Sequence, residues 1–154
     1  MYLRGILITV CAAAAFVVGF CLCGHVAVAA PPEFAPGQMW SIKSAPATTA
    51  KVVIVRVEPW QNRTVVHVSI IDIPVPKGAR AENSITAVGH MPFDESALAE
   101  SVDRLLGTGG SPAPGFEYAY EQWRADKTAG IFTISVSKAI ELMLQSAGEL
   151  SRER

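Results

Sequence analysis

The spacing of apolar residues changes partway along the chain. From residue 38 to residue 89 the apolar side chains occur in short runs that are largely β-branched, which is typical of strands. We expect strands at residues 38–43, 51–58, 64–73 and 84–89. A turn at residues 59–63 (PWQNR) makes the second and third strands an antiparallel hairpin. Residues 31–37, 44–50 and 74–83 are rich in Pro, Ala, Gly or charge and are expected to be irregular.

The strand at residues 64–73 has two unequal faces. Alternation places Val66, Val68 and Ile70 on one face, which we expect to meet the core. The other face carries His67, Ser69 and Ile71, and we expect it to be half exposed.

After residue 93 the apolar spacing approaches 3.6 residues, which predicts helices. Asp94 is expected to cap a helix that extends to Leu106 and ends at Gly107. Phe93 and Leu98 occupy the positions of a hydrophobic staple around that cap. The helix would pack through Leu98, Val102 and Leu105.

The last third of the chain predicts two more helices and one strand. Residues 116–127 carry an aromatic stripe of Phe116, Tyr120 and Trp123, residues 131–136 read as a strand, and a helix begins at Ser137. Residues 151–154 are expected to be frayed. Strands followed by helices indicate an α+β fold, with about four to five mainly antiparallel strands and two or three helices packed on one face.

The N-terminal thirty residues have the pattern of a secretory signal peptide. Arg4 precedes an uncharged apolar run, which leads to the small-residue site Ala27-Val28-Ala29. We expect cleavage after Ala29, which leaves residues 30–154 as one domain in the periplasm or outside the cell. The alternative is an uncleaved inner-membrane anchor at residues 5–30, because about 20 apolar residues span a bilayer. A membrane association is expected only in that case.

Loss of this leader changes the composition of the exported chain. The three cysteines of the full sequence, Cys11, Cys21 and Cys23, all lie in the leader. The exported domain is therefore expected to have no disulfide, thiolate metal ligand or cysteine nucleophile. Without Arg4, 13 − 1 = 12 basic residues face 14 acidic ones. This balance gives no sign of a nucleic-acid partner. No ligand spacing of a zinc site occurs, and we expect neither metal nor cofactor.

Two groups of residues are candidates for a functional site. The charged and aromatic segment around Tyr118, Glu121, Trp123 and Arg124 contains the residue types that most often anchor interfaces. Trp60 in the predicted turn and His90 before a proline are added to this binding set. At helical spacing the aromatic stripe also suits core packing, and Trp60 also suits covering the sheet edge. Glu121 and Arg124 are expected to pair as i and i+3 neighbours.

The alternative site is catalytic and uses His67, His90 and Asp94. It requires a histidine to meet a carboxylate in a pocket, the other candidates being Asp72, Glu117 and Glu121. The plain structural interpretation is that each imidazole fills space and bonds to the backbone.

Several short segments occur in a recognisable order: GQMWS at residues 37–41, HMPF at 90–93, YEQWR at 120–124 and AGIFTI at 129–134. This series resembles a family of small, uncharacterised bacterial proteins. The resemblance implies a single-domain α+β fold and a bacterial source, and it brings no activity. It makes the HMPF and YEQWR segments the first places to look for a shared surface.

The sequence therefore favours an exported, non-enzymatic domain that binds a protein or another component of the cell envelope. The alternative is a small hydrolase or ligand-binding protein with a histidine–carboxylate site. A third reading is a structural or stress-related envelope protein without a defined small ligand.

Overall fold

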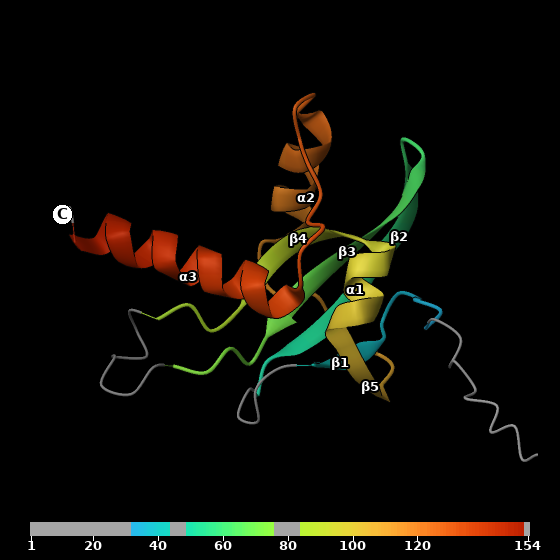
Figure 1. Ribbon diagram of the computed structural model, residues 1–154, viewed down its shortest axis with the longest axis horizontal. Coiled ribbons are helices and arrows are strands. Elements are labelled where there is room, and N and C mark those ends of the chain that lie inside the picture. Colours follow the sequence, from blue (N-terminus) through green and yellow to red (C-terminus); the bar gives the residue numbers. More distant parts are fainter. Residues whose placement is uncertain (1–31, 44–48, 76–83, 153–154) are drawn as a thin grey trace, which may run out of the picture. The chain divides into compact units, whose positions relative to one another are not determined.

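Five strands form one antiparallel sheet in the order β4-β3-β2-β1-β5 (Figure 1). All neighbouring strands in this order run antiparallel. The strands are β1 (Met39–Ile42), β2 (Lys51–Trp60), β3 (Arg63–Ile71), β4 (Val88–Asp94) and β5 (Val102–Gly107). The helices are α1 (Glu95–Ser101), α2 (Phe116–Ala125) and α3 (Val136–Arg152). The predicted α+β class is confirmed.

The computed structural model describes residues 32–43, 49–75 and 84–152. The chain divides into two units, Met1–Ala30 and Pro31–Arg154, and all of the described residues belong to the second. The predicted signal peptide at residues 1–29, the alternative anchor at residues 5–30 and most of the two predicted loops at 44–50 and 74–83 lie outside the described residues. Within the described ranges no helix is both long and apolar enough to cross a bilayer.

The sheet is buried on both faces in its centre. On one face Val66, Val68 and Ile70 of β3 join a core that includes Leu98 of α1 and residues of α3. The opposite face of β3 carries Val65, His67 and Ser69, which are also fully buried. The expectation that this second face is half exposed is therefore wrong.

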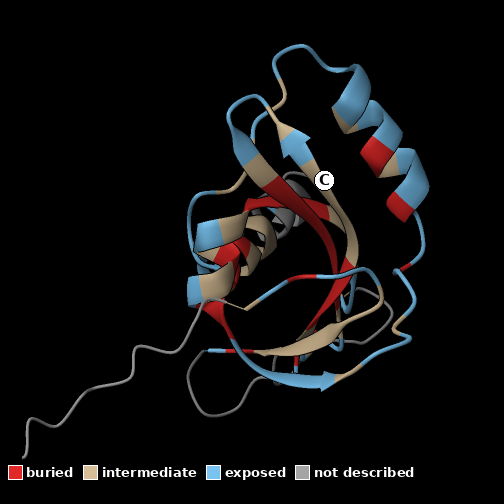
Figure 2. Ribbon diagram, turned by 90° about the vertical axis from the view of Figure 1, so that its right-hand side faces the viewer, coloured by how far each residue is buried: buried red, intermediate tan, exposed pale blue. Residues whose placement is uncertain are grey.

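Helices explain this double burial. Helices α1 and α3 cover the face of Val66, as expected for helices packed on one side, and α2 packs on the face of His67. The buried residues of α2 are Phe116 and Tyr120. Most of the rest of that helix is exposed (Figure 2). The nearly continuous apolar runs of β2 and β3 suit a sheet covered on both sides.

The β2–β3 turn is tighter than predicted. Pairing continues to Trp60 opposite Arg63, so the turn contains only Gln61 and Asn62. Gln61 adopts a φ of 54°, in the left-handed region that short hairpin turns use. A register shift between Ile54 and Arg56 marks a bulge in β2. The turn predicted at residues 59–63 is therefore wrong, because Pro59 and Trp60 belong to the strand.

Three other predicted boundaries are wrong. The strand expected at residues 84–89 is β4, which begins later and continues through Pro92 to Asp94. The long helix from Asp94 ends at Ser101, because residues 102–107 pair with β1 as β5. The strand expected at residues 131–136 is a single bridge from Phe132 to Phe93. Cross-strand pairing overrides the helical spacing of Leu98, Val102 and Leu105.

The remaining helix predictions hold except at the C-terminal ends. Asp94 caps α1, its carboxylate accepting from the backbone N–H of Ser96 at 3.0 Å. Both staple residues, Phe93 and Leu98, are fully buried in the core. The aromatic helix is α2, which ends at Ala125, two residues before its predicted end. The C-terminal helix is α3, which extends to Arg152, so the expectation that residues 151 and 152 are frayed is wrong.

Candidate functional site

Helix α2 is held against the sheet at its N-terminal end by close backbone contact. A Cβ on Gly89 would lie 2.9 Å from the carbonyl oxygen of Pro114, so only glycine lets the loop before α2 approach β4 this closely. The hydroxyl of Ser69 donates to the carbonyl of Gly89 at 2.5 Å and accepts from the N–H of Ala113 at 3.0 Å. These bonds fix the helix over β3 and β4.

Two histidines from neighbouring strands meet beneath α2. His67 of β3 is 0% exposed, and its Nδ1 lies 2.9 Å from Nε2 of the half-buried His90 of β4. The two rings are stacked, with centroids 5.1 Å apart. Tyr120 and Trp123 of α2 meet the ring of His67 edge-on, at 5.0 and 4.7 Å. The sequence leaves two roles open for the aromatic stripe of α2, an interface or packing in the core. In the structure the stripe packs against the sheet.

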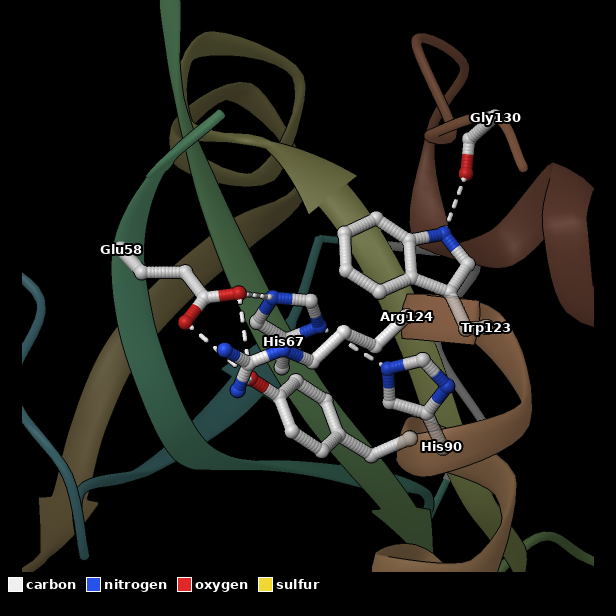
Figure 3. Close-up of polar contacts among 7 residues, drawn as sticks. Glu58, His67, His90, Trp123, Arg124 and Gly130 are labelled. Carbon is white, nitrogen blue, oxygen red and sulfur yellow. Dashed lines mark hydrogen bonds and ion pairs between the residues drawn. The ribbon is translucent and has the colours of Figure 1, made fainter. Parts of the chain in front are cut away.

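A carboxylate completes the cluster. Nε2 of His67 lies 3.1 Å from Oε1 of Glu58, on β2 (Figure 3). The hydroxyl of Tyr120 donates to both oxygens of Glu58, at 3.2 and 3.1 Å. Arg124 in turn donates to the Tyr120 hydroxyl at 3.4 Å. Glu58 is thus fixed by two side chains while about a third of its own side chain stays exposed.

The hydrogen-bond pattern determines which nitrogens carry protons. A carboxylate only accepts, so Nε2–H of neutral His67 donates to Glu58 and its Nδ1 must accept. Nε2–H of His90 then donates to Nδ1 of His67. The result is a directed chain from His90 through His67 to Glu58. Nδ1 of His90 then carries a lone pair that no group among the described residues uses.

Burial keeps both imidazoles neutral. Desolvation lowers the pKa of His67, against the neighbouring Glu58, which raises it. Desolvation, and after it the repulsion that a protonated His67 would exert, lowers the pKa of His90 to about 4. The histidine pair is therefore uncharged at neutral pH, as the directed chain requires.

Arg56 of β2 fastens α2 from the other side of Tyr120. Its guanidinium lies 4.5 Å from the centre of the Tyr120 ring, in a cation–π contact. Its Nη2 also pairs with Glu117 at 2.8 Å. Both partners of that pair are substantially exposed, so the pair itself adds little stability. The contacts together align α2 with β2, the strand that carries Glu58.

An open pocket of about 380 Å³ lies between the hairpin tip and the C-terminal end of α2. Residues 58–61 line one side, and the other side is lined by Trp123, Arg124, Asp126, Lys127 and Ala129. The rings of Trp60 and Trp123 lie 5.9 Å apart and are tilted by 41°. Nε1–H of Trp123 donates to the carbonyl of Gly130 at 2.8 Å, which fixes its indole (Figure 3). Glu58 belongs both to this pocket and to the histidine cluster.

The predicted binding residues separate into two groups. Trp60, Trp123 and Arg124 come together at the pocket, and His90 lies in the adjoining cluster under α2. Tyr118 is 74% exposed on the outer side of α2, and Glu121 is also exposed. Among the described residues neither of these two side chains lines the pocket. The expected pair of Glu121 and Arg124 does not form there either, since Arg124 bonds to Tyr120 instead.

The alternative catalytic set is also only partly assembled. His67 and His90 are in contact, but Asp94 caps α1 and pairs with Arg63 at 3.1 Å. The hydrogen bonds of Asp94 to Ser96 are the largest cause of its lowered pKa. The other carboxylates considered are likewise committed elsewhere or exposed: Asp72 pairs with Lys51, Glu117 with Arg56, and Glu121 faces outward.

Sequence reasoning missed Glu58, the carboxylate that does meet a histidine. A five-residue turn pairs Glu58 with Thr64 and sends its side chain to the core face. The real two-residue turn pairs Glu58 with Val65, which puts Glu58 and His67 on the same face as diagonal neighbours. The one-residue difference in register decides the face. A tighter hairpin was the only signal that could have revealed the pair.

The described residues contain no group of three or more histidine, cysteine, aspartate or glutamate side chains that could hold a metal ion. No protein-family model matches the chain, and no curated protein or solved structure is similar to it. The resemblance to a bacterial family therefore stays a prediction.

Proposed function

We propose that the protein is an exported binding domain of the bacterial cell envelope and that the pocket at the β2–β3 hairpin tip holds its ligand or partner. Export is supported by the charge, apolar run and small-residue site of residues 1–29. Binding rather than catalysis is supported by the pocket, which combines two indoles with several polar side chains.

The observation that carries this proposal is the position of Glu58. Glu58 lines the pocket, and hydrogen bonds from Tyr120 and His67 fix its carboxylate. These bonds form without any ligand. A recognition group fixed in advance loses little side-chain entropy on binding. Trp60, Trp123 and Arg124 add the residue types that contribute most strongly in binding sites.

The experiment is chemical crosslinking of the exported protein in intact cells, followed by its intact mass. A wild-type chain is compared with the double variant Trp60→Ala/Arg124→Ala, and Tyr118→Ala serves as the matched control outside the pocket. We expect a discrete adduct on the wild type and the control, on a chain that begins at Ala30. The adduct should be lost in the double variant. An adduct that survives in the double variant contradicts the pocket, and a chain that starts at Met1 contradicts cleavage.

A second function is favoured by one specific observation, the directed chain from His90 to Glu58. Such a chain orients an imidazole and gives it a defined tautomer, as a general base in a small hydrolase requires. The lowered pKa of His90, about 4, makes it a weak base and argues for the binding role. Hydrolysis of simple esters that is lost in His90→Gln but kept in Trp60→Ala would favour the enzyme.

A further inference from the structure

We propose that the pocket binds a neutral, polyhydroxylated ring, which is the chemistry of a carbohydrate. This inference rests on the proposed function and names the class of ligand for the same pocket. Three features of the pocket point to it: the paired indoles, the balance of charge, and the supply of unpaired donors beside a fixed acceptor.

The paired indoles provide apolar surface suited to a ring. Trp60 and Trp123 are both half-buried, and their centroids lie 5.9 Å apart at a tilt of 41°. The two rings thus make an angled wall rather than a closed stack. The C–H faces of a pyranose pack on indole faces while its hydroxyls stay at the rim, which matches the amphipathic nature of tryptophan.

The balance of charge disfavours an ionic ligand. The pocket contains two carboxylates, Glu58 and Asp126, and two cations, Arg124 and Lys127. Their formal charges cancel, so neither an anion nor a cation gains a net attraction. A neutral ligand with many hydroxyls can use both signs, since each hydroxyl donates and accepts.

The hydrogen-bonding groups are arranged for such a ligand. Glu58 is a fixed acceptor, because Tyr120 and His67 orient it and the chain continues to His90. Among the described residues no partner bonds to Nε1–H of Trp60 or to the ammonium of Lys127, and both lie in residues that line the pocket. The pocket therefore offers unpaired donors beside an anchored acceptor.

The volume is consistent with one or two sugar rings. About 380 Å³ lies near the lower end of the range for small-molecule pockets, which is roughly 300–1,000 Å³. The pocket is open rather than enclosed, so a longer glycan can continue beyond it.

The test is a titration of the exported domain, residues 30–154, followed by tryptophan fluorescence and calorimetry. The sugar probes are maltotriose, cellotriose and the trimer of N-acetylglucosamine. The competing classes are inorganic phosphate, tetramethylammonium and glycylglycine, which represent an anion, a cation and a zwitterion. Each probe is also applied to Trp60→Ala, to Trp60→Phe, which keeps a ring, and to Tyr118→Ala as the control outside the pocket.

We expect one trisaccharide to bind with a Kd on the order of 1 mM or tighter. Binding should weaken at least about tenfold in Trp60→Ala, recover in large part in Trp60→Phe and stay unchanged in Tyr118→Ala. Circular dichroism of each variant shows whether it has kept the fold.

Three results would overturn the inference. If an ionic probe alone binds and Trp60→Ala removes it, the ligand class is wrong and the pocket remains the binding site. If no sugar binds at millimolar concentration while the cellular adduct still depends on Trp60 and Arg124, the class is again wrong. If a sugar binds equally well to Trp60→Ala, the pocket is not its site. If the cellular adduct does not depend on Trp60 and Arg124, that result contradicts the proposed function instead.

Discussion

His67 Nδ1 lies 2.9 Å from His90 Nε2, so a single hydrogen bond, donated by His90, joins two histidines on adjacent strands. The bond joins a fully buried imidazole to a half-buried one. It orients the ring of His67, which in turn donates to Glu58 at the pocket. A buried polar network of this kind is stable only when each member has its partner. The predictions below remove its members one at a time.

Acidification should destabilise the protein through the two histidines. Both folded-state pKa values lie below the value of about 6.5 expected in the unfolded chain, so the unfolded chain binds more protons as the pH falls. The free energy of unfolding should be constant above pH 6.5 and should decrease between about pH 6.5 and pH 4. The loss from His90, reduced for its partial exposure, is on the order of 2 kcal/mol.

Urea unfolding at a series of pH values checks this dependence. His90→Gln keeps a side-chain N–H donor for His67 but cannot titrate, so its pH slope should be shallower than that of the wild type. Equal slopes would show that His90 does not carry the effect. The contribution of Asp94 is separable, because its lowered pKa means that its stabilisation is lost only below its ordinary value of 3.8.

Truncation of Glu58 should be among the most destabilising changes at this site. Glu58→Ala leaves His67 Nε2–H and the Tyr120 hydroxyl without their acceptor, and His67 is fully buried. The expected cost is about 2–3 kcal/mol. Glu58→Gln keeps one acceptor oxygen and should cost about 1 kcal/mol. Chemical denaturation measures both, and equal costs for the two variants would rule out the acceptor role.

Tyr120→Phe should lower stability by about 1 kcal/mol, because the ring stays packed on His67 while the bonds to Glu58 are lost. Tyr118→Phe is the matched control on the same helix, since Tyr118 is 74% exposed and should change stability by less than about 0.5 kcal/mol. Thermal unfolding of the two variants side by side tests the difference. Similar shifts in both would mean that the Tyr120 hydroxyl contributes nothing.

The sequence predicts the sheet better than it predicts the site. The β-branched runs of β2 and β3 identify the hairpin, and Asp94 identifies the start of α1, because both signals are local. No local signal determines the end of α1. Residues 102–107 have helical spacing, yet they pair with β1, some sixty positions earlier in the chain. Pairing between strands so far apart in the chain cannot be predicted from the spacing of apolar residues.

The site depends on register, which the apolar pattern determines only weakly. The residue types of Trp60, Trp123 and Arg124 predict a binding role, and these three residues meet at the pocket. Glu58 was missed because a turn that is too long by three residues turns its side chain to the wrong face. Alternation along β3 predicts a half-exposed His67, because it cannot reveal that α2 covers the second face and buries this residue.

Gly89→Ala should displace α2 from the sheet. A methyl group there lies within 3.1 Å of backbone atoms of Pro114, Gly115 and Phe116, none of which can rotate away. We expect a loss of at least about 2 kcal/mol and a change in the fluorescence of Trp123. Gly130→Ala is the control, because nothing lies within 4 Å of its Cβ position. A Gly89→Ala protein as stable as this control would contradict the close approach of α2 to β4.

The most direct test of the account is site-specific photo-crosslinking in the exporting cell. A photo-reactive residue replaces Gln61, which lines the pocket, in one chain and the exposed Tyr118 of α2 in the other. We expect a discrete adduct from position 61, lost when Trp60→Ala is added, and none from position 118. An adduct from position 118 alone would contradict it, because binding would then use the outer face of α2 instead of the pocket that Glu58 anchors.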